Sequence, residues 1–499
     1  MSPSTAVRPR PQPTADDASG ATADRRGRTA LITGATGYVG GQLVPEMLRR
    51  GWRVRVLSRS ADKIATKPWG DDVEVTEGDA TDGDALRSAM EGVDVAYYLL
   101  HSMDTQGNFV ERDREMAQTF TEAAESSGVG RLVYLGGLHP EGDDLSAHLS
   151  SRVEVGEIML RSSVPAAVVQ AGVVLGDGSV SFDMLRHLTE RLPAFVAPKW
   201  LRSKIQPIAV DDVVDRLAVV AELGSEHDRT FDVGGPDVLT YAEMMQRYAR
   251  QTGLRRRLIV TLPVLTPGLA SHWVGLVTPV SSGVATPLVG SLVHDAVVRE
   301  DDLTGLVGPP PGGGVGYEEA VRRATRSVDP KRWSRWLRWS LGVVGAAAVV
   351  GTVASDPRSD WYRSLDLPRW QPPVAAFPVV WSALYAGIAL VSAATGAELE
   401  ESDAEDQAKG YRRALETNMA LNAGWCLLFF QGHRVPGLRR VALAAATAEC
   451  AVLTASSADL ARRSAPAGRG RVVVLGAYAA WSAFATVLSG TIWRRNPGR

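Results

Sequence analysis

Five long apolar stretches fill the last third of the 499-residue chain, and no other feature limits its possible folds as strongly. The stretches are 339–354, 372–397, 417–432, 441–458 and 472–493. A helix needs about 20 apolar residues to cross the hydrocarbon core of a bilayer. The second and fifth stretches meet that length, and the others reach it if flanking side chains extend their charged ends to the interface. A buried soluble bundle is the alternative, but the short loops and the helices that are apolar all round disfavour it. We therefore expect an all-α five-helix transmembrane bundle.

Tryptophan marks a boundary between this region and the rest of the chain. Nine of the 13 tryptophans lie in the last third, so the mean hydropathy of -0.05 averages two unlike parts. Residues 1–28 are polar and lack the apolar run of a signal peptide, which predicts a disordered tail and a first domain that stays in the cytoplasm. We expect domains at 29–325 and 339–496, joined by a basic, tryptophan-rich linker at 326–338.

The charge and the cysteine content exclude two classes of function. A net charge of -2 gives no reason to expect nucleic acid as a partner. The two cysteines, Cys426 and Cys450, form no CxxC pair or Cys/His cluster, so we expect no metal site.

Short apolar runs alternate with amphipathic stretches in the first domain. The runs 29–33, 53–58, 93–100, 131–137 and 166–172 read as strands separated by helices. This alternation predicts the α/β class, with a doubly wound parallel sheet of the Rossmann type.

A glycine-rich turn follows the first predicted strand. The segment "GATGYVG" has the GxxGxxG spacing, and glycines there allow a tight turn and a close approach of the backbone to a pyrophosphate. The helix that follows adds N–H groups and the positive end of its dipole. The predicted cofactor-binding residues of this turn are Gly34, Thr36, Gly37, Tyr38, Val39 and Gly40. An ordinary glycine turn is the alternative.

The end of the second strand favours NADP(H), with NAD(H) possible. A free ribose 2′-hydroxyl usually meets Asp or Glu there, whereas a 2′-phosphate favours Arg. The segment "LSRSADK" offers Arg59 and Lys63 instead of an acid at its start, although both could be solvated surface charges. Further along, Asp79 and Ala80 of "EGDATD" are placed to bracket an adenine ring.

These motifs together resemble the extended or atypical short-chain dehydrogenases/reductases, closest to the NAD(P)H-binding, NmrA-like branch. The likeness spans about 29–325 and includes "TGATGYVGG", "QPIAVDDVVDRL" and "FDVGGPDVLTYAEMMQRYA". It implies a Rossmann half that binds NAD(P) and a smaller part that shapes a substrate pocket.

One departure from that family concerns catalysis. Its reductases use a YxxxK pair, but this chain has no Tyr between Tyr134 and Tyr241. The nearest substitute is "HLSSR", where His148 and Arg152 lie four residues apart on a predicted helix. Imidazole can move protons near neutral pH, so the pair is a candidate, although such a His is often only exposed. "GGLHP" also stands where active members carry Ser or Thr.

The apolar region resembles the TspO/MBR family, the tryptophan-rich sensory and peripheral benzodiazepine receptor-like proteins. "WYRSLDLPRWQPP" (361–373), "ALNAGWCLLFF" and "AYAAWSAFATVLSGTIWRRN" carry the likeness. It implies a membrane bundle that binds porphyrins and other flat hydrophobic ligands, with a possible homodimer. The ligand-binding residues that it implies are Trp361, Tyr362, Pro368, Trp370, Trp381, Tyr385, Asn422, Trp425 and Trp481. Packing and interface anchoring are the alternative roles. Glu449 is a further candidate because it is an intramembrane carboxylate.

Three hypotheses for function remain open. The first is a membrane-anchored, NADP(H)-dependent oxidoreductase acting on a lipophilic or tetrapyrrole-like substrate. The second is a non-enzymatic sensor that couples nucleotide state to the membrane pocket, and the third is a porphyrin carrier.

The charges around the predicted spans indicate the orientation in the membrane. Twelve Lys and Arg residues flank one side of the predicted spans and nine flank the other, which together with the nucleotide-binding domain places the N-terminus inside. We thus expect a multi-pass protein of the cell membrane with a cytoplasmic N-terminal domain.

Overall fold

The computed structural model describes residues 27–100, 109–140, 145–262 and 288–497, together with residues 142 and 278. The chain divides into two compact units, Met1–Ser327 and Val328–Arg499. Most of the predicted tail, up to residue 26, lies outside the described residues. The boundary between the units falls inside the segment predicted as a linker.

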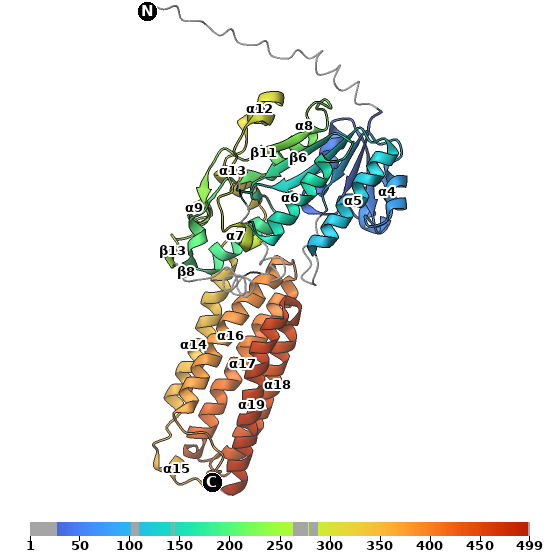
Figure 1. Cartoon of the computed structure of the whole chain (residues 1–499). Coiled ribbons are helices and arrows are strands. Elements are labelled where there is room, and N and C mark those ends of the chain that lie inside the picture. Colours follow the sequence, from blue (N-terminus) through green and yellow to red (C-terminus); the bar gives the residue numbers. More distant parts are fainter. Residues whose placement is uncertain are drawn as a thin grey trace, which may run out of the picture. The chain divides into compact units, whose positions relative to one another are not determined.

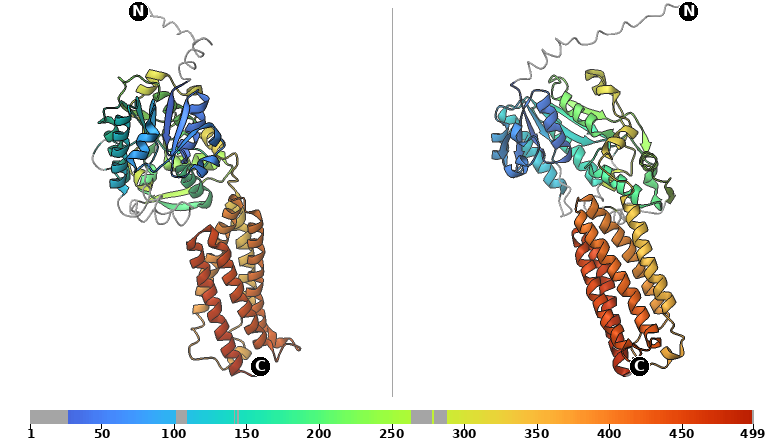
Figure 2. Two further views of the ribbon diagram at one scale, coloured as in Figure 1. Left: turned by 90° about the vertical axis from the view of Figure 1, so that its right-hand side faces the viewer. Right: turned by 180° about the vertical axis from the view of Figure 1, so that it is seen from behind.

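A seven-stranded parallel sheet organises the first unit (Figures 1 and 2), which confirms the predicted Rossmann-type class. Its strand order is β11-β6-β5-β4-β1-β2-β3. The order reverses at β1, whose Ile32 lies opposite Val56 of β2 on one side and Tyr97 of β4 on the other. The strands are β1 (Thr29–Thr33), β2 (Arg53–Ser58), β3 (Glu74–Glu77), β4 (Val95–Tyr98), β5 (Arg131–Gly137), β6 (Ala166–Ala171) and β11 (Arg229–Val233).

Helices cover both faces of this sheet because successive side chains of each strand point to opposite faces. Ile32 joins a cluster with Met47 of α2 and Leu217 of α8, whereas its neighbour Leu31 joins a cluster with Phe120 of α5. The helices are α2 (Tyr38–Arg49), α3 (Ala61–Ala65), α4 (Gly83–Met90), α5 (Phe109–Ser127), α6 (Ala147–Leu160) and α8 (Val210–Val220).

Two strands of the sheet were absent from the predicted set. The sequences of β3, "EVTE", and β11, "RTFDV", contain more polar residues than a buried apolar run. Both lie at the edges of the sheet, where a strand pairs with one neighbour only.

A second core of the first unit surrounds Phe182, Tyr241, Tyr248 and Tyr317. It contains three two-stranded sheets, β10 with β7, β12 with β9 and β13 with β8. The elements are β7 (Val174–Leu175), α7 (Val180–Arg191), β8 (Ala194–Pro198), β9 (Lys204–Ile205), β10 (Ile208–Ala209), β12 (Leu239–Thr240), α9 (Tyr241–Gln251), β13 (Leu258–Leu262), α12 (Asp302–Val307) and α13 (Tyr317–Ala324).

The described part of the second unit is all-helical, with five long helices and one short helix. They are α14 (Arg332–Ala354), α15 (Asp360–Arg363), α16 (Ala376–Glu401), α17 (Glu405–Gln431), α18 (Ala442–Ser464) and α19 (Arg469–Arg495). The predicted linker at 326–338 is wrong from Arg332 onward, because its tryptophans pack as part of α14. Trp336 is 1% exposed, and the Arg412 guanidinium of α17 lies 4.8 Å from its ring centroid.

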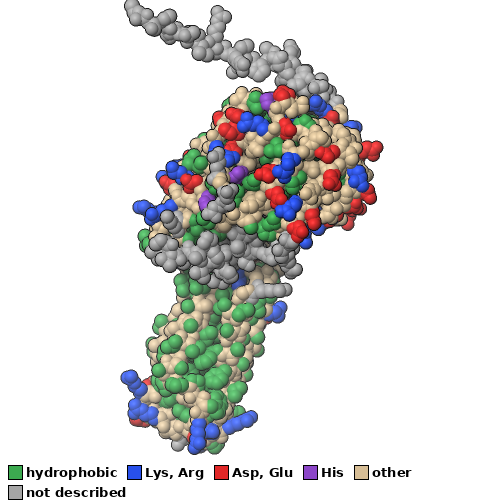
Figure 3. All heavy atoms as spheres, in the orientation of Figure 1, with side chains coloured by type: hydrophobic (Ala, Val, Ile, Leu, Met, Phe, Trp, Pro, Cys, Tyr) green, Lys and Arg blue, Asp and Glu red, His purple; other side chains and the backbone are tan. Residues whose placement is uncertain are grey.

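Three of the long helices are long and apolar enough to cross a membrane. They are Arg332–Ala354, Ala376–Glu401 and 470–495. At about 1.5 Å per residue, α17 and α18 are long enough, but α17 begins with several charged residues and α18 contains Glu449 and Asp459. Figure 3 shows apolar side chains along the side of the bundle and Lys and Arg side chains gathered at the lower end in this view. The predicted count of five spans stays a prediction.

Candidate functional site

The glycine-rich turn between β1 and α2 leaves its backbone open to a ligand. Gly34 has a φ of 77°, which favours glycine, and a Cβ there would lie 2.6 Å from the Leu99 carbonyl oxygen. A Cβ on Gly40 would lie 2.3 Å from the Gly34 oxygen, so only glycine lets α2 pack this close to the turn. The Gly37 N–H donates to the Gly34 oxygen at 2.9 Å and closes the turn.

The N-terminus of α2 can accept an anion. Its N-cap residue is Gly37, so no side chain caps the first turn, and that turn contains no acidic residue. The N–H groups at the start of a helix and its dipole favour a phosphate. Thr36 and Gly37 are exposed, whereas Val39 packs on the core. The Tyr38 side chain packs against Gly176 and Gly178, so its main-chain N–H is the part that remains for a cofactor.

Two positive side chains follow β2, as the sequence predicts. Arg59 and Lys63 are both exposed. An acid also lies close, since the Glu77 carboxylate accepts a hydrogen bond of 2.7 Å from the Ala61 N–H. Glu77 is therefore tied to the start of α3.

The loop after β3 brings the predicted adenine-site residues together. The hydrogen bonds that Asp79 accepts from the Thr81 N–H and hydroxyl, at 3.0 and 2.9 Å, lower the pKa of its carboxyl, and nearby Arg59 contributes. Ala80 packs partly on the cluster beneath α4 and α5. These bonds fix the shape of the loop and place a negative charge near Arg59.

His148 and Arg152 both lie in the first half of α6, beside the carboxyl end of β5. The Arg152 guanidinium donates to the Leu135 carbonyl oxygen at 2.6 Å. Partial burial lowers the pKa of the His148 imidazole to about 4, and the positive charge of Arg152 contributes. His148 makes no side-chain hydrogen bond with the described residues. Its ring is thus neutral at pH 7, and none of the described residues engages its nitrogens.

A second histidine at the end of β5 is held by a network that the sequence does not predict. In His139, Nδ1 lies 2.9 Å from the Pro140 carbonyl oxygen, which places a proton on Nδ1. The Gln170 amide donates to Nε2 at 3.0 Å and accepts from Arg299 at 2.9 Å. Arg299 in turn pairs with the buried Asp232. Both nitrogens of His139 are engaged, so His148 is the better candidate for chemistry.

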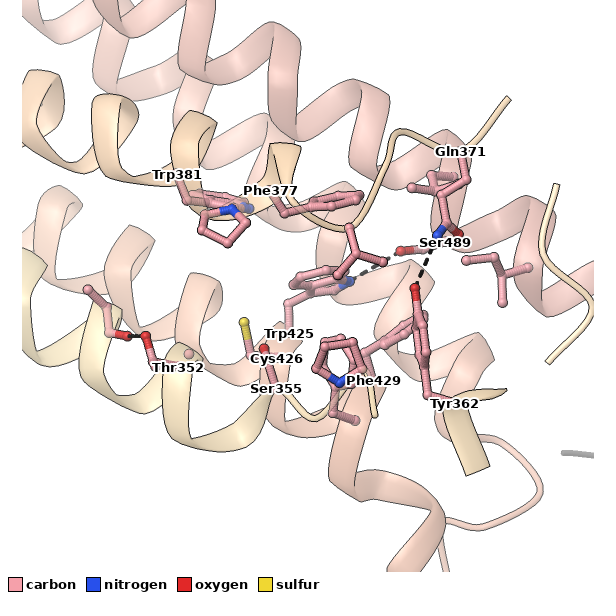
Figure 4. A pocket seen from close by; sticks show the side chains of 18 of the residues that line it. Thr352, Ser355, Tyr362, Gln371, Phe377, Trp381, Trp425, Cys426, Phe429 and Ser489 are labelled. Atoms are coloured by element: carbon pink, nitrogen blue, oxygen red, sulfur yellow. Dashed lines mark hydrogen bonds between the residues drawn. The ribbon is translucent and has the colours of Figure 1, made fainter. Parts of the chain in front are cut away.

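The second unit contains a cavity of about 360 Å³, close to the smaller ligand pockets of proteins, which measure about 300–1,000 Å³. Four of the predicted ligand-binding residues line it, namely Tyr362, Trp381, Tyr385 and Trp425. Figure 4 shows the side chains of Tyr362, Trp381 and Trp425 with Phe377 and Phe429 around the cavity. Apolar and aromatic side chains make up most of the lining.

The other predicted ligand-binding residues lie outside this lining. Trp361 stacks on His433 with centroids 4.3 Å apart, and Trp370 contacts Phe484 at 5.8 Å. Trp481 packs between Phe377 and Phe484. Asn422 is buried and accepts a hydrogen bond of 2.7 Å from the Tyr385 hydroxyl, so it supports a lining residue. Pro368 belongs to the loop that precedes α16.

Several lining residues were missed because no sequence pattern distinguishes them from packing. Gln371 donates to the Tyr362 hydroxyl at 3.1 Å, and Trp425 donates to Ser489 at 3.3 Å, as Figure 4 shows. The loop over the cavity is tied to α19, because Asn496 accepts from the Asp366 N–H and donates to its carbonyl oxygen. Glu449 faces α17 outside this lining, where Gly424 leaves room for its carboxylate.

The fold and the turn define a class: a nucleotide-binding Rossmann-type unit joined to an apolar helical unit of the membrane-protein kind. Comparisons with known families agree with both parts. Residues 340–494 match the TspO/MBR family, and residues 34–166 match the NAD(P)H-binding family. Both suspected resemblances are thereby confirmed.

Individual relatives resemble the first unit. Ceramide reductase of Caulobacter vibrioides is 29% identical over 327 residues, which cover 64% of this chain and 98% of that protein. A 3 beta-hydroxysteroid dehydrogenase/Delta 5-->4-isomerase of Mycobacterium tuberculosis is 30% identical over 114 residues, 21% of this chain and 30% of that protein. The 40 kDa subunit of NADH-ubiquinone oxidoreductase from Neurospora crassa is 25% identical over 237 residues, 46% of this chain and 62% of that protein.

Solved structures also resemble this part of the chain. Triphenylmethane reductase of Citrobacter sp., complexed with NADP(H), has 19% identity and a TM-score of 0.47, covering 59% of this chain and 99% of that one. An NADPH-dependent quinone oxidoreductase of Escherichia coli has 18% identity and a TM-score of 0.47, covering 59% and 98%.

Proposed function

We propose that this protein is a membrane-bound, NADP(H)-dependent reductase of a lipophilic carbonyl compound. The observation that carries the proposal is the neutral His148 with Arg152 at the carboxyl end of β5, on the same sheet edge as the open glycine turn. Ligands of doubly wound sheets bind at this edge. The apolar helices of the second unit and its family support a place in a membrane.

The residues present fit a nicotinamide dinucleotide. The start of α2 would hold the pyrophosphate, and Arg59 with Lys63 would meet a ribose 2′-phosphate, which favours NADP(H) over NAD(H). Asp79 and Ala80 would border the adenine. When bound, the cofactor supplies or accepts a hydride.

His148 would polarise the substrate carbonyl. Its neutral ring donates a hydrogen bond through the protonated nitrogen to the carbonyl oxygen, and a neutral imidazole is a known electrophile in another enzyme. Burial, with a contribution from the Arg152 guanidinium, keeps the ring neutral. Arg152 would also stabilise negative charge on the oxygen. The alcohol proton then comes from the ring nitrogen, which water reprotonates.

A lipid is the substrate class that we favour. The likeness to a ceramide reductase extends over nearly all of that protein, and the steroid dehydrogenase relative also acts on a lipid-like compound by its name. A membrane-bound enzyme meets such compounds at a high local concentration.

The first test is NADPH oxidation by the full-length protein in lipid nanodiscs that contain long-chain ketones or keto-sphingoid lipids. We expect turnover with at least one of them. His148→Gln should lower kcat by about 10²-fold or more. His227→Gln, at another histidine of the first unit, serves as the matched control and should leave kcat unchanged. Equal loss in both variants would contradict a specific role of His148.

A non-enzymatic sensor is the second candidate, because the chain lacks the Tyr of the YxxxK pair. In that case NADPH binds, none of the lipophilic carbonyls supports its oxidation, and NADPH changes the affinity of the membrane cavity for its ligand. The same preparation distinguishes the two functions by measuring both turnover and ligand binding.

The cavity of the second unit would bind a flat hydrophobic ligand such as a porphyrin, as a sensor or carrier requires. Aromatic rings stack on such ligands, and each ring adds about 1 kcal/mol beyond area burial. Trp425→Leu should therefore weaken protoporphyrin binding about fivefold in a fluorescence-quenching titration. Trp370→Leu, which removes a tryptophan outside the lining, is the control. Equal protoporphyrin affinities of the parent, Trp425→Leu and Trp370→Leu would show that this cavity is not the binding site.

A further inference from the structure

The face of the small β8/β13 sheet in the first unit is apolar and exposed. The two strands pair in parallel, with Leu258 opposite Ala194 and Val260 opposite Val196. Leu258 is 65% exposed, Val196 49% and Val260 47%. The alternate residues Phe195 and Ile259 turn inward and pack on the second core. One face of the sheet thus buries its side chains, and the other presents two neighbouring aliphatic pairs.

Exposed basic side chains flank this apolar face at both ends. Arg255 and Arg256 lie shortly before β13, separated from it by Arg257, and Arg202 and Lys204 follow β8. All four are exposed, whereas Arg257 turns inward and is buried. Aliphatic side chains between clusters of Arg and Lys are the composition that lies in the interface of a membrane with anionic headgroups.

We propose that the β8/β13 face docks on the surface of the bilayer, with Val196, Leu258 and Val260 among the acyl chains and the flanking Arg and Lys side chains on lipid phosphates. A lipid surface is the favoured occupant for two reasons. The basic residues complement anionic headgroups. The chain also continues from this unit into α14, a candidate membrane span, and this connection would keep the unit near a bilayer. This contact goes beyond the proposed reductase activity, and it would bring the first unit to the lipid phase from which a lipophilic substrate comes.

The experiment measures which medium surrounds this face in the full-length protein. Val260→Cys carries an NBD fluorophore, and the matched control is Val238→Cys, a similarly exposed valine of the same unit at 50% exposure. The two native cysteines are buried, so the unsubstituted protein corrects for background labelling. Nanodiscs of phosphatidylcholine and phosphatidylglycerol contain a lipid with a nitroxide on its acyl chain, and iodide serves as the aqueous quencher. Unchanged melting of the labelled variants verifies their fold.

We expect the label at position 260 to be quenched severalfold more by the nitroxide lipid than the label at 238, and less by iodide. Arg255→Glu with Arg256→Glu should reduce the lipid quenching toward the control level. Iodide quenching at 260 equal to that at 238 would overturn the proposal, because the face would then be in water. Protection from both quenchers would also overturn it, since a second copy or the uncharged segment 263–287 of this chain would then cover the face. Because no step depends on turnover, failure of this test is separate from failure of the proposed reductase.

Discussion

At the scale of single residues, the two histidines beside β5 differ in what their surroundings leave open. His139 has both ring nitrogens engaged by Pro140 and Gln170, whereas His148 makes no side-chain hydrogen bond with the described residues. Burial and Arg152 lower the pKa of His148 to about 4. A protonated His148 is therefore disfavoured in the folded state, and this has a measurable consequence.

His148 should make the first unit sensitive to mild acid. The ordinary pKa of about 6.5 applies in the unfolded chain, so between about pH 6.5 and pH 4 the unfolded state binds more protons. Stability consequently rises with pH through this window and is constant for this group above it. From pH 7 to pH 5 the parent should lose about 1–2 kcal/mol more than His148→Gln, after allowance for the partial exposure of the ring. Thermal melts of both proteins at these pH values check this. An equal fall in melting temperature from pH 7 to pH 5 in the parent and in His148→Gln would contradict the lowered pKa of His148.

Arg59 should decide the choice of cofactor. Loss of a charged hydrogen bond to a 2′-phosphate costs about 1.5–3 kcal/mol, so Arg59→Asp should weaken NADPH binding at least tenfold and leave NADH binding nearly unchanged. Calorimetry on the full-length protein in detergent gives both affinities. Arg87→Asp, at an exposed Arg of α4, is the control for a general charge effect. An unchanged NADPH affinity in Arg59→Asp would contradict the assignment.

At the scale of helices and strands, the sequence predicted those elements whose pattern is local. The strands β1, β2 and β5 have the predicted bounds because each is an apolar run next to a turn. The polar edge strands β3 and β11 were missed because pairing with a neighbour, which a single sequence does not show, makes them strands. The start of α14 was missed because Arg332–Arg338 is charged on one face and packs Trp336 on the other.

Close packing of α14 on α16 should depend on a small residue. A Cβ on Gly396 would lie 2.3 Å from the Trp336 ring, which the Arg412 guanidinium also contacts. Gly396→Ala should therefore destabilise the bundle by about 1–3 kcal/mol, despite the better helix propensity of Ala. Gly342→Ala is the matched control, because nothing lies within 4 Å of a Cβ there. Thermal denaturation in detergent compares the two, and a stabilised Gly396→Ala would contradict this packing.

In the candidate sites too, the sequence predicts only those residues that belong to a local pattern. The glycine turn can be recognised in the sequence because its residues are consecutive, and the structure explains Gly34 and Gly40 by contacts shorter than a Cβ allows. Its role in cofactor binding stays a prediction. Most of the cavity lining was not predicted, because residues such as Phe377, Gln371 and Ser489 come from separate elements with no shared motif. The tryptophans of the 361–373 loop were predicted as ligand residues, yet Trp361 and Trp370 pack on other rings.

At the scale of the whole molecule, the chain should be an integral membrane protein with its ends on opposite sides. Three helices meet the composition of a span, and an odd total of three or five gives this topology. Reporter fusions at Met1 and Arg499 should report a cytoplasmic N-terminus and an external C-terminus. Carbonate treatment should leave the protein in the membrane fraction. Two ends on the same side would show an even number of spans.

The bonds between Asn496 and Asp366 have a consequence for the order in which the molecule matures. They join positions 130 residues apart, and α19 also supplies Leu488 and Ser489 to the cavity wall. During synthesis the first four helices of the bundle leave the ribosome while this wall is still missing. The loop at 361–373 therefore has no final anchor until α19 has been made, and a ligand that needs an enclosed cavity cannot be captured earlier. A ribosome stalled before α19 would hold a nascent chain with a complete nucleotide-binding unit and an open, unfinished pocket.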